Sequence, residues 1–124
     1  MTKKVYIAAL YSRMDEMQSY GFLLESGLGY TVTSKWMYGN EIGMTNAEGA
    51  LMDIEDLTEA DICLSFTQPF GSMFTGGGRH TELGYALAIG KECVIIGERE
   101  QIFHHLPQIK QYDTFDDYMK AQTE

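Results

Sequence analysis

The stretch VYIAAL at residues 5–10 is an unbroken apolar run, which is typical of a strand buried on both faces of a sheet. Four further runs predict strands. The run at residues 30–36 alternates and indicates a strand near a sheet edge. The runs at 61–66 and 93–96 indicate buried strands, and the run at 110–112 indicates a weak last strand. Each run is separated from the next by a longer segment, so the first stretch begins a repeated strand–helix pattern.

The longer segments predict helices at residues 12–26, 46–57, 81–89, 100–105 and 114–121. Ser12 with Asp15, and Thr114 with Asp117, have the spacing of capping boxes, which begin helices. Alternating strands and helices predict an α/β three-layer sandwich with a parallel sheet between two layers of helices. For a chain of this length we expect five strands in the flavodoxin-like order 2-1-3-4-5.

Length and charge limit the possible functions. The chain has 124 residues, and we expect one domain over residues 1–124. Its net charge of −9 disfavours nucleic acids and anionic membranes as partners. No run approaches the ~20 apolar residues of a membrane helix, and the N-terminus lacks a signal-peptide pattern, so we expect a cytoplasmic protein. Cys63 and Cys93 lie in apolar runs and are expected to be free, buried thiols.

Ligands of such sheets bind beyond the carboxyl ends of the strands, near the point where the strand order reverses. Two segments are expected there, at residues 10–13 and in the long glycine-rich connection at residues 67–80. Gly76, Gly77 and Gly78 would allow backbone amides to converge on an anion at the start of a helix. A flexible linker is an equally good interpretation of these three glycines.

Three charged residues of this region are candidates for chemistry. Glu82 is expected in or near the first turn of a helix, where the helix dipole would keep it ionised and suited to nucleophilic attack. The plainer interpretation is that Glu82 only compensates the helix dipole. Arg13 and Arg79 could bind a phosphate. Alternatively they form surface ion pairs, Arg13 with Asp15 or Glu16 and Arg79 with Glu82.

Other polar residues carry weaker signals. Asp53 and Asp56 lie near the end of a helix, where acids oppose the dipole, although a solvated face is the simpler interpretation of Asp53. His104 and His105 have no third ligand at metal spacing, so we expect neither a metal nor a cofactor. The sequence contains no GxxxxGK[ST] motif, and Gly27-Leu28-Gly29 precedes a strand rather than following one.

Three stretches carry a resemblance to a known family: VYIAA at residues 5–9, DLTEADI at 56–62 and GRHTELGYALAIGK at 78–91. They resemble the nucleoside 2-deoxyribosyltransferase superfamily, which includes hydrolases of deoxynucleoside monophosphates and of cytidine monophosphate. The resemblance runs over nearly the whole chain, and ELGYA followed by GK is its most specific part. It implies a flavodoxin-like sheet, a glutamate nucleophile and cleavage of an N-glycosidic bond.

The resemblance also implies roles for individual residues. Glu82 would attack C1′ of the sugar, Tyr6 would orient its carboxylate, and Asp56 would lie near the base. The substrate and its phosphate would be bound by Ser12, Arg13, Gly76, Gly77, Gly78, Arg79, His80 and His104. His104 belongs to the segment at residues 103–105, with which a neighbouring subunit would complete the site of a homodimer or larger homo-oligomer.

One position departs from the transferases of the superfamily. They have an aspartate six residues before the nucleophile, where this chain has Gly76. The residues GRH at 78–80 resemble the cytidine monophosphate hydrolases more closely, and Arg79 adds a positive charge where a phosphate could lie. We therefore expect hydrolysis of a nucleoside 5′-monophosphate with retention. The alternatives are a deoxyribosyltransferase, a nucleotide-binding protein without catalysis, and a structural domain with a vacant crevice.

Overall fold

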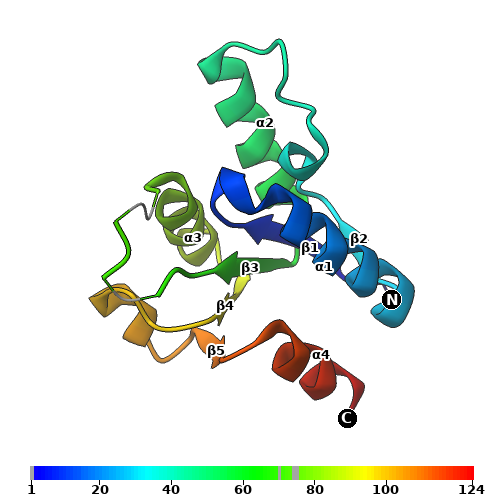
Figure 1. Ribbon diagram of the computed structural model, residues 1–124, viewed down its shortest axis with the longest axis vertical. Coiled ribbons are helices and arrows are strands. Elements are labelled where there is room, and N and C mark those ends of the chain that lie inside the picture. The colour runs from blue at the N-terminus through cyan, green and yellow to red at the C-terminus, as the bar shows by residue number, and fades with distance from the viewer. Residues whose placement is uncertain (1, 70, 74–75) are drawn as a thin grey trace.

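The strands form one parallel sheet in the computed structural model of the protein, which describes residues 2–69, 71–73 and 76–124. Their order is β2-β1-β3-β4-β5, which confirms the order expected from the sequence (Figure 1). The strands are β1 (Lys4–Ala8), β2 (Thr31–Val32), β3 (Ile62–Phe66), β4 (Glu92–Ile96) and β5 (Lys110–Tyr112). Nearly every residue of the three central strands is buried, as their apolar sequences predict.

Helices cover both faces of this sheet. The described α-helices are α1 (Met14–Leu28), α2 (Asn46–Glu59), α3 (Gly78–Ala88) and α4 (Phe115–Thr123). Short 3-10 helices are η1 (Tyr11–Arg13), η2 (Lys35–Tyr38) and η3 (Ile102–His105). Helix α1 packs beside α4 and α2 packs beside α3, and Figure 1 shows the two pairs on opposite sides of the strands. The three-layer α/β arrangement expected from the sequence is therefore confirmed.

The start of the first long helix differs from the expectation. Ser12 and Asp15 have the spacing of a capping box, but Ser12 is exposed in η1, and Arg13 precedes α1 without a side-chain cap. The reason is that the chain makes a 3-10 turn before the helix begins. At α4 the corresponding prediction is confirmed, because Thr114 Oγ1 accepts a hydrogen bond from the Asp117 backbone N–H at 3.1 Å.

The second strand is shorter than the run at residues 30–36 predicts. Only Thr31 and Val32 belong to the strand, which pairs with β1 at the sheet edge. The chain then turns into η2, which buries Trp36, and the Trp36 indole N–H donates a hydrogen bond to the Ile7 carbonyl at 2.8 Å. Burial of this large side chain with a satisfied N–H favours the turn over a longer strand.

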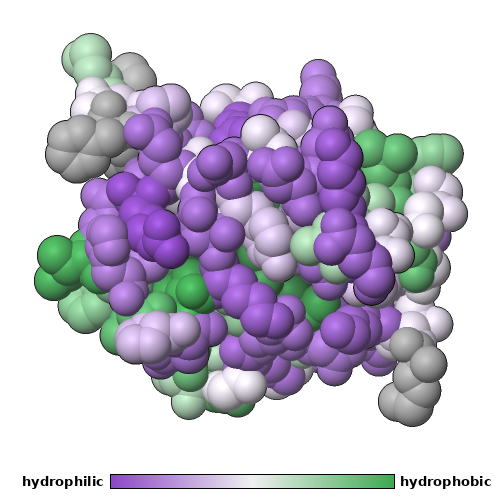
Figure 2. Space-filling model, turned by 90° about the horizontal axis from the view of Figure 1, so that it is seen from below, coloured by the Kyte–Doolittle hydropathy of each residue, from purple (hydrophilic) through white to green (hydrophobic). Residues whose placement is uncertain are grey.

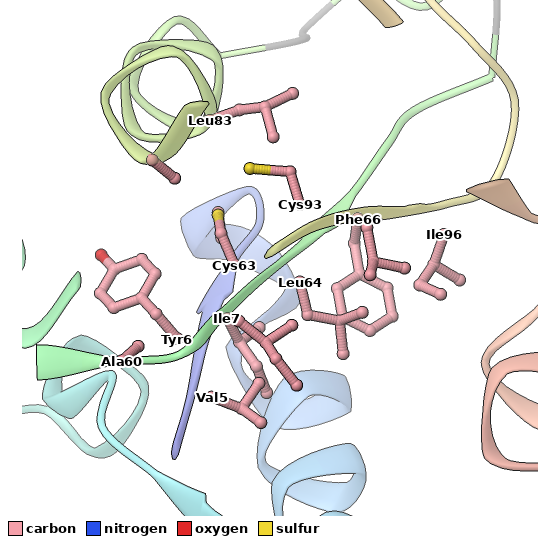
Figure 3. Packing of buried hydrophobic residues seen from close by; sticks show 14 of the residues in the cluster. Val5, Tyr6, Ile7, Ala60, Cys63, Leu64, Phe66, Leu83, Cys93 and Ile96 are labelled. Atoms are coloured by element: carbon pink, nitrogen blue, oxygen red, sulfur yellow. The ribbon is translucent and has the colours of Figure 1, made fainter. Parts of the chain in front are cut away.

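The central strand β1 divides its side chains between the two helical layers. Figure 3 shows Val5 and Ile7 on one side of β1 and Tyr6 on the other, as strand alternation requires. Tyr6 thus lies on the side of the sheet that α3 covers. Cys63 and Cys93 are adjacent in the pairing of β3 with β4, and both are buried and free, as expected.

The surface agrees with the acidic composition. The face shown in Figure 2 is largely hydrophilic, and its apolar side chains gather in separate patches between the polar ones. Hydrophilic residues thus separate the apolar areas on this face. Among the described residues, no helix combines the length and the apolar character that crossing a membrane requires.

Candidate active site

A cleft of about 320 Å³ opens beyond the carboxyl end of β1, between α2 and α3. Its wall includes Tyr11, Trp36, Glu41, Asp53, Gly76, Gly78, Arg79 and Glu82. Strand β1 lies between β2 and β3, where the order of the sheet reverses. The cleft therefore occupies the crevice in which ligands of this type of sheet bind.

Glu82 and Tyr6 meet at this cleft. Tyr6 is fully buried, and its hydroxyl donates a hydrogen bond to Glu82 Oε2. The contact forms because alternation along β1 directs the Tyr6 ring toward α3, as Figure 3 shows for the ring itself. Burial, followed by the negative charge of Glu82, raises the pKa of the Tyr6 hydroxyl, which therefore stays protonated and acts as a donor.

Glu82 differs from the expectation in its place on the helix and in its charge state. Helix α3 begins at Gly78 rather than at Thr81, so Glu82 lies in the second turn, and the first turn holds no acidic residue. Burial raises the pKa of Glu82 to about 7, against the opposing effect of the Tyr6 hydrogen bond. Glu82 is thus not held fully ionised at neutral pH by the helix dipole, since desolvation has the larger effect.

The two aspartates of α2 exchange the places that the sequence suggests. Asp56 is buried away from the cleft wall, where its Oδ1 accepts a hydrogen bond from Lys35 Nζ at 2.5 Å and its Oδ2 accepts one from the Lys35 backbone N–H at 3.1 Å. Asp53 lies nearly one turn earlier and lines the cleft. Asp53 rather than Asp56 therefore lines the cleft, and the prediction of a solvated face for Asp53 is wrong, because its Oδ1 is buried.

Asp53 has an unusual environment. Its Oδ1 is buried and has no hydrogen-bond partner among the described residues. Burial raises the pKa of Asp53 to about 7, and the charges of Glu82 and Glu41 and a hydrogen bond with Glu41 add to the effect. A carboxyl group with such a pKa can donate or accept a proton near neutral pH, which is what general acid–base chemistry requires.

The structure does not bring Arg13 or Ser12 to the cleft. Arg13 forms two hydrogen bonds of 2.8 Å with Glu16, which confirms the ion-pair alternative. Its Nη1 donates to the Thr67 carbonyl at 3.1 Å and to Gln68 Oε1 at 2.9 Å. The last two hydrogen bonds tie the start of α1 to the chain after β3, so Arg13 is engaged within the protein rather than at the ligand crevice.

Arg79 does line the cleft, although its partner is not the expected one. Both of its terminal nitrogens donate to the carboxylate of Glu100, and the pair is almost completely buried. The predicted pair of Arg79 with Glu82 is wrong, because the buried Arg79 side chain extends toward the segment that follows β4. Glu100 also accepts a hydrogen bond from the Gln68 backbone N–H at 2.9 Å. Its carboxylate therefore connects the segment after β3 and the segment after β4 to α3.

The glycines before α3 form the cleft edge. Gly76 has a φ of +65°, and a Cβ at this position would lie 2.6 Å from Leu10 Cδ2, so a side chain here would be strained and would require Leu10 to move. Gly77 precedes the helix, and Gly78 is its first residue. The first amides of α3 are thus at the cleft edge, which agrees with anion binding. Phe70, Phe74 and Thr75 of the predicted connection lie outside the described residues.

Neither predicted histidine lines the cleft. His80 lines a second hollow of about 400 Å³ with Phe103 and Gln101, and His80 Nδ1 is 2.9 Å from Gln101 Nε2. His104 is buried inside its own chain, where its Nδ1 accepts a hydrogen bond from the Glu100 backbone N–H at 3.0 Å. Its ring is therefore not available to a neighbouring subunit, in contrast to the exposed Phe103 beside it.

Sequence reasoning did not identify Glu41 or Trp36 as cleft residues. Glu41 lies in a loop between Gly39 and Gly43, and no motif or spacing pointed to it. Trp36 and Tyr11 also line the cleft, with ring centroids 6.1 Å apart, and offer apolar contact area to a flat ligand. Within the described parts of the chain, no three or more His, Cys, Asp or Glu residues are arranged to hold a metal ion.

No protein-family model matches the sequence, and a search of curated proteins found no match. Solved structures with the same fold were found. The CMP N-glycosidase BcmB of Clostridium botulinum is 19% identical, with a TM-score of 0.68 over 98% of each chain. A 2-desoxiribosyltransferase from Leishmania mexicana is 18% identical, with a TM-score of 0.58 over 91% of this chain and 76% of that one. The chain thus shares its fold with a glycosidase and with a transferase.

Proposed function

We propose that the protein is an N-glycosidase that hydrolyses nucleoside 5′-monophosphates, with Glu82 as the nucleophile. One observation carries the proposal: the Glu82 carboxylate is held by the Tyr6 hydroxyl in the cleft at the reversal point of the sheet. The resemblance of the sequence to the nucleoside 2-deoxyribosyltransferase superfamily supports it. The shared fold with a CMP N-glycosidase and a 2-desoxiribosyltransferase supports it independently.

The proposed reaction has two displacement steps. The ionised Glu82 attacks C1′ of the sugar and forms an ester, while Asp53 gives a proton to the departing base. Water then attacks C1′ and releases the sugar phosphate, so the configuration at C1′ is retained. A pKa of about 7 for Glu82 leaves a substantial ionised fraction at neutral pH, and Tyr6 restrains the carboxylate from rotating.

The phosphate would be recognised at the start of α3. The amides there, near Gly76 and Gly78, supply N–H donors to an anion. Arg79 also lines the cleft, but Glu100 pairs with both of its terminal nitrogens, so its charge is largely balanced within the protein. Binding of a nucleotide phosphate therefore depends on the α3 amides.

A panel of ribo- and deoxyribonucleoside 5′-monophosphates tests the proposal, with free base measured by chromatography. Glu82→Gln should slow base release by at least about 10³-fold, because removing a nucleophile removes the covalent route. The matched control is Glu55→Gln, which removes an exposed acid of α2 away from the cleft and should leave the rate unchanged. A glycosylated Glu82 detected by mass spectrometry would support the ester intermediate.

The same panel distinguishes the alternatives. Release of base by Glu82→Gln at the wild-type rate would rule out Glu82 as nucleophile. Thermal stabilisation by a nucleotide without any free base would favour a binding protein, an alternative that the glycine at position 76 keeps open. Adding a second free base and finding a new nucleotide would identify transfer rather than hydrolysis.

A further inference from the structure

The loop at residues 39–45 places its side chains opposite to the usual preference. Ile42 is 82% exposed, although burial of an isoleucine side chain is favourable. The neighbouring Glu41, which would be well solvated outside, is partly buried and lines the cleft. Solvation alone would select the reverse arrangement, so the inward position of Glu41 needs another explanation.

The backbone of the loop holds Glu41 in this position. Gly39 ends η2 with a φ of +79°, and its carbonyl accepts a hydrogen bond from the Ile42 N–H at 3.2 Å. The Glu41 carbonyl accepts one from the Met44 N–H at 3.0 Å, and Thr45 then caps α2. Two successive turns between fixed helix ends therefore determine where Glu41 points.

Glu41 and Asp53 line the same cleft within hydrogen-bond reach of each other, and both lie near Glu82. The titratable and charged groups around Asp53 are Tyr6 of β1, Glu41 of the loop, Asp56 of α2, and Arg79 and Glu82 of α3. Asp56 is paired with Lys35, Arg79 with Glu100, and Tyr6 with Glu82. Glu41 is thus the carboxylate that is placed to accept a hydrogen bond from a protonated Asp53.

We propose that Glu41 is a positioning residue for proton transfer, which keeps a proton on the Asp53 carboxyl group and directs it toward the departing base. The inference rests on the proposed N-glycosidase function. It also gives this chain a proton source despite the glycine at position 76, where the transferases of the superfamily have an aspartate. Two carboxyl groups that share one proton are a known means of storing it near neutral pH.

The proton balance of the reaction is complete with this pair. In the first step the bond between C1′ and the base nitrogen breaks, Glu82 bonds to C1′, and the Asp53 proton moves to the base. Asp53 is then ionised. In the second step water bonds to C1′, its proton returns to Asp53, and the ester bond to Glu82 breaks. One water is consumed, and the Glu41–Asp53 pair is restored.

Two substrates separate proton transfer from the other steps. One is a nucleotide that the wild type cleaves, and the other is the same sugar phosphate with 4-nitrophenol at C1′, a leaving group that needs no proton. Glu41→Ala should slow the nucleotide reaction by about tenfold, within the range of general acid effects. It should leave nitrophenol release within about twofold of wild type. Glu55→Gln is the control that should change neither rate.

The pH profile for the nucleotide gives a second measurement. Besides burial, the charge of Glu41 raises the pKa of both Asp53 and Glu82, so Glu41→Gln should move both limbs of the profile to lower pH. Equal slowing of both substrates, or an unmoved profile, would overturn the inference while leaving the proposed function intact. If the wild type releases no base from any nucleotide, the proposed function itself fails, and the inference fails with it.

Discussion

The acids of the cleft and the acids around it have opposite environments. Glu16, Asp56 and Glu100 each contact an arginine or lysine at hydrogen-bond distance. None of the ion pairs among the described residues includes Glu41, Asp53 or Glu82. The ion pairs among the described residues thus lie outside the group of cleft acids, which have no cation partner.

The presence or absence of a cation partner decides whether burial raises the pKa of a carboxyl group in this protein. Burial would raise the pKa of Glu100, but the hydrogen bonds from Arg79 and from the Gln68 backbone hold that pKa below its usual value. At Glu82 and Asp53 burial has the larger effect, and the pKa of each rises to about 7. The same chemical group therefore keeps its charge in one region and has a pKa near neutral pH in the other.

The largest expected effect comes from breaking a connecting pair. Glu100→Gln leaves the buried Arg79 charge without its carboxylate, which should lower the free energy of unfolding by about 3–5 kcal/mol. Glu16→Gln removes the partner of the half-buried Arg13 and should cost less than about 1 kcal/mol. Urea denaturation measures both. Equal losses in the two variants would contradict the distinction between the buried pair and the surface pair.

The two aspartates of α2 sharpen the comparison within one helix. Asp53→Asn should reduce base release by about 10²-fold without loss of stability, because it removes a proton carrier that has no cation partner. Asp56→Asn should lower the free energy of unfolding by about 1–2 kcal/mol and leave base release per folded molecule unchanged. Rates and denaturation curves for both variants are the measurements. If Asp56→Asn slowed base release and Asp53→Asn did not, Asp56 would be the acid of the site.

A smaller effect is expected in the pH dependence of stability. Asp53 has a higher pKa in the folded protein than the ordinary aspartate value, so folding takes up a proton, and this contribution to stability is lost as pH rises from about 4 to 7. In Asp53→Asn the free energy of unfolding should fall less steeply over that range, by on the order of 1 kcal/mol.

The two histidines whose pKa is lowered act in the opposite direction, which is why a difference between variants is needed. Burial lowers the pKa of His80 and His104, so protonation of the unfolded chain reduces stability as pH falls. Both proteins contain these histidines, so their contribution cancels when wild type and Asp53→Asn are compared. Identical slopes in the two proteins would mean that Asp53 has the same proton affinity in the folded and the unfolded chain.

Elements built from continuous apolar runs could be predicted from the sequence. The central strands follow from patterns of adjacent residues, whereas α3 begins at Gly78, three residues earlier than the sequence predicts. The short β2 could not be predicted, because the burial of Trp36 against Ile7 depends on a contact between distant segments. Local propensity is overridden in such cases by tertiary packing.

The candidate site was predictable only in part, for a similar reason. Glu82 and Tyr6 belong to recognisable stretches, and the structure brings them together. The choice between Asp53 and Asp56 depends on which side of α2 faces the sheet edge and Lys35, and their spacing does not reveal it. Glu41 is placed by two turns of a loop, so its partner Asp53 is known only from the folded chain.

The close approach of Gly76 to Leu10 couples the loop after β1 to the loop before α3. The Cβ of an aspartate introduced at position 76 would lie 2.6 Å from Leu10 Cδ2, so the flexible end of the Leu10 side chain would have to move. The aspartate would also have to keep a positive φ, which costs an aspartate less than most residues. Acquisition of an acid at this position therefore calls for adjustment of Leu10 as well.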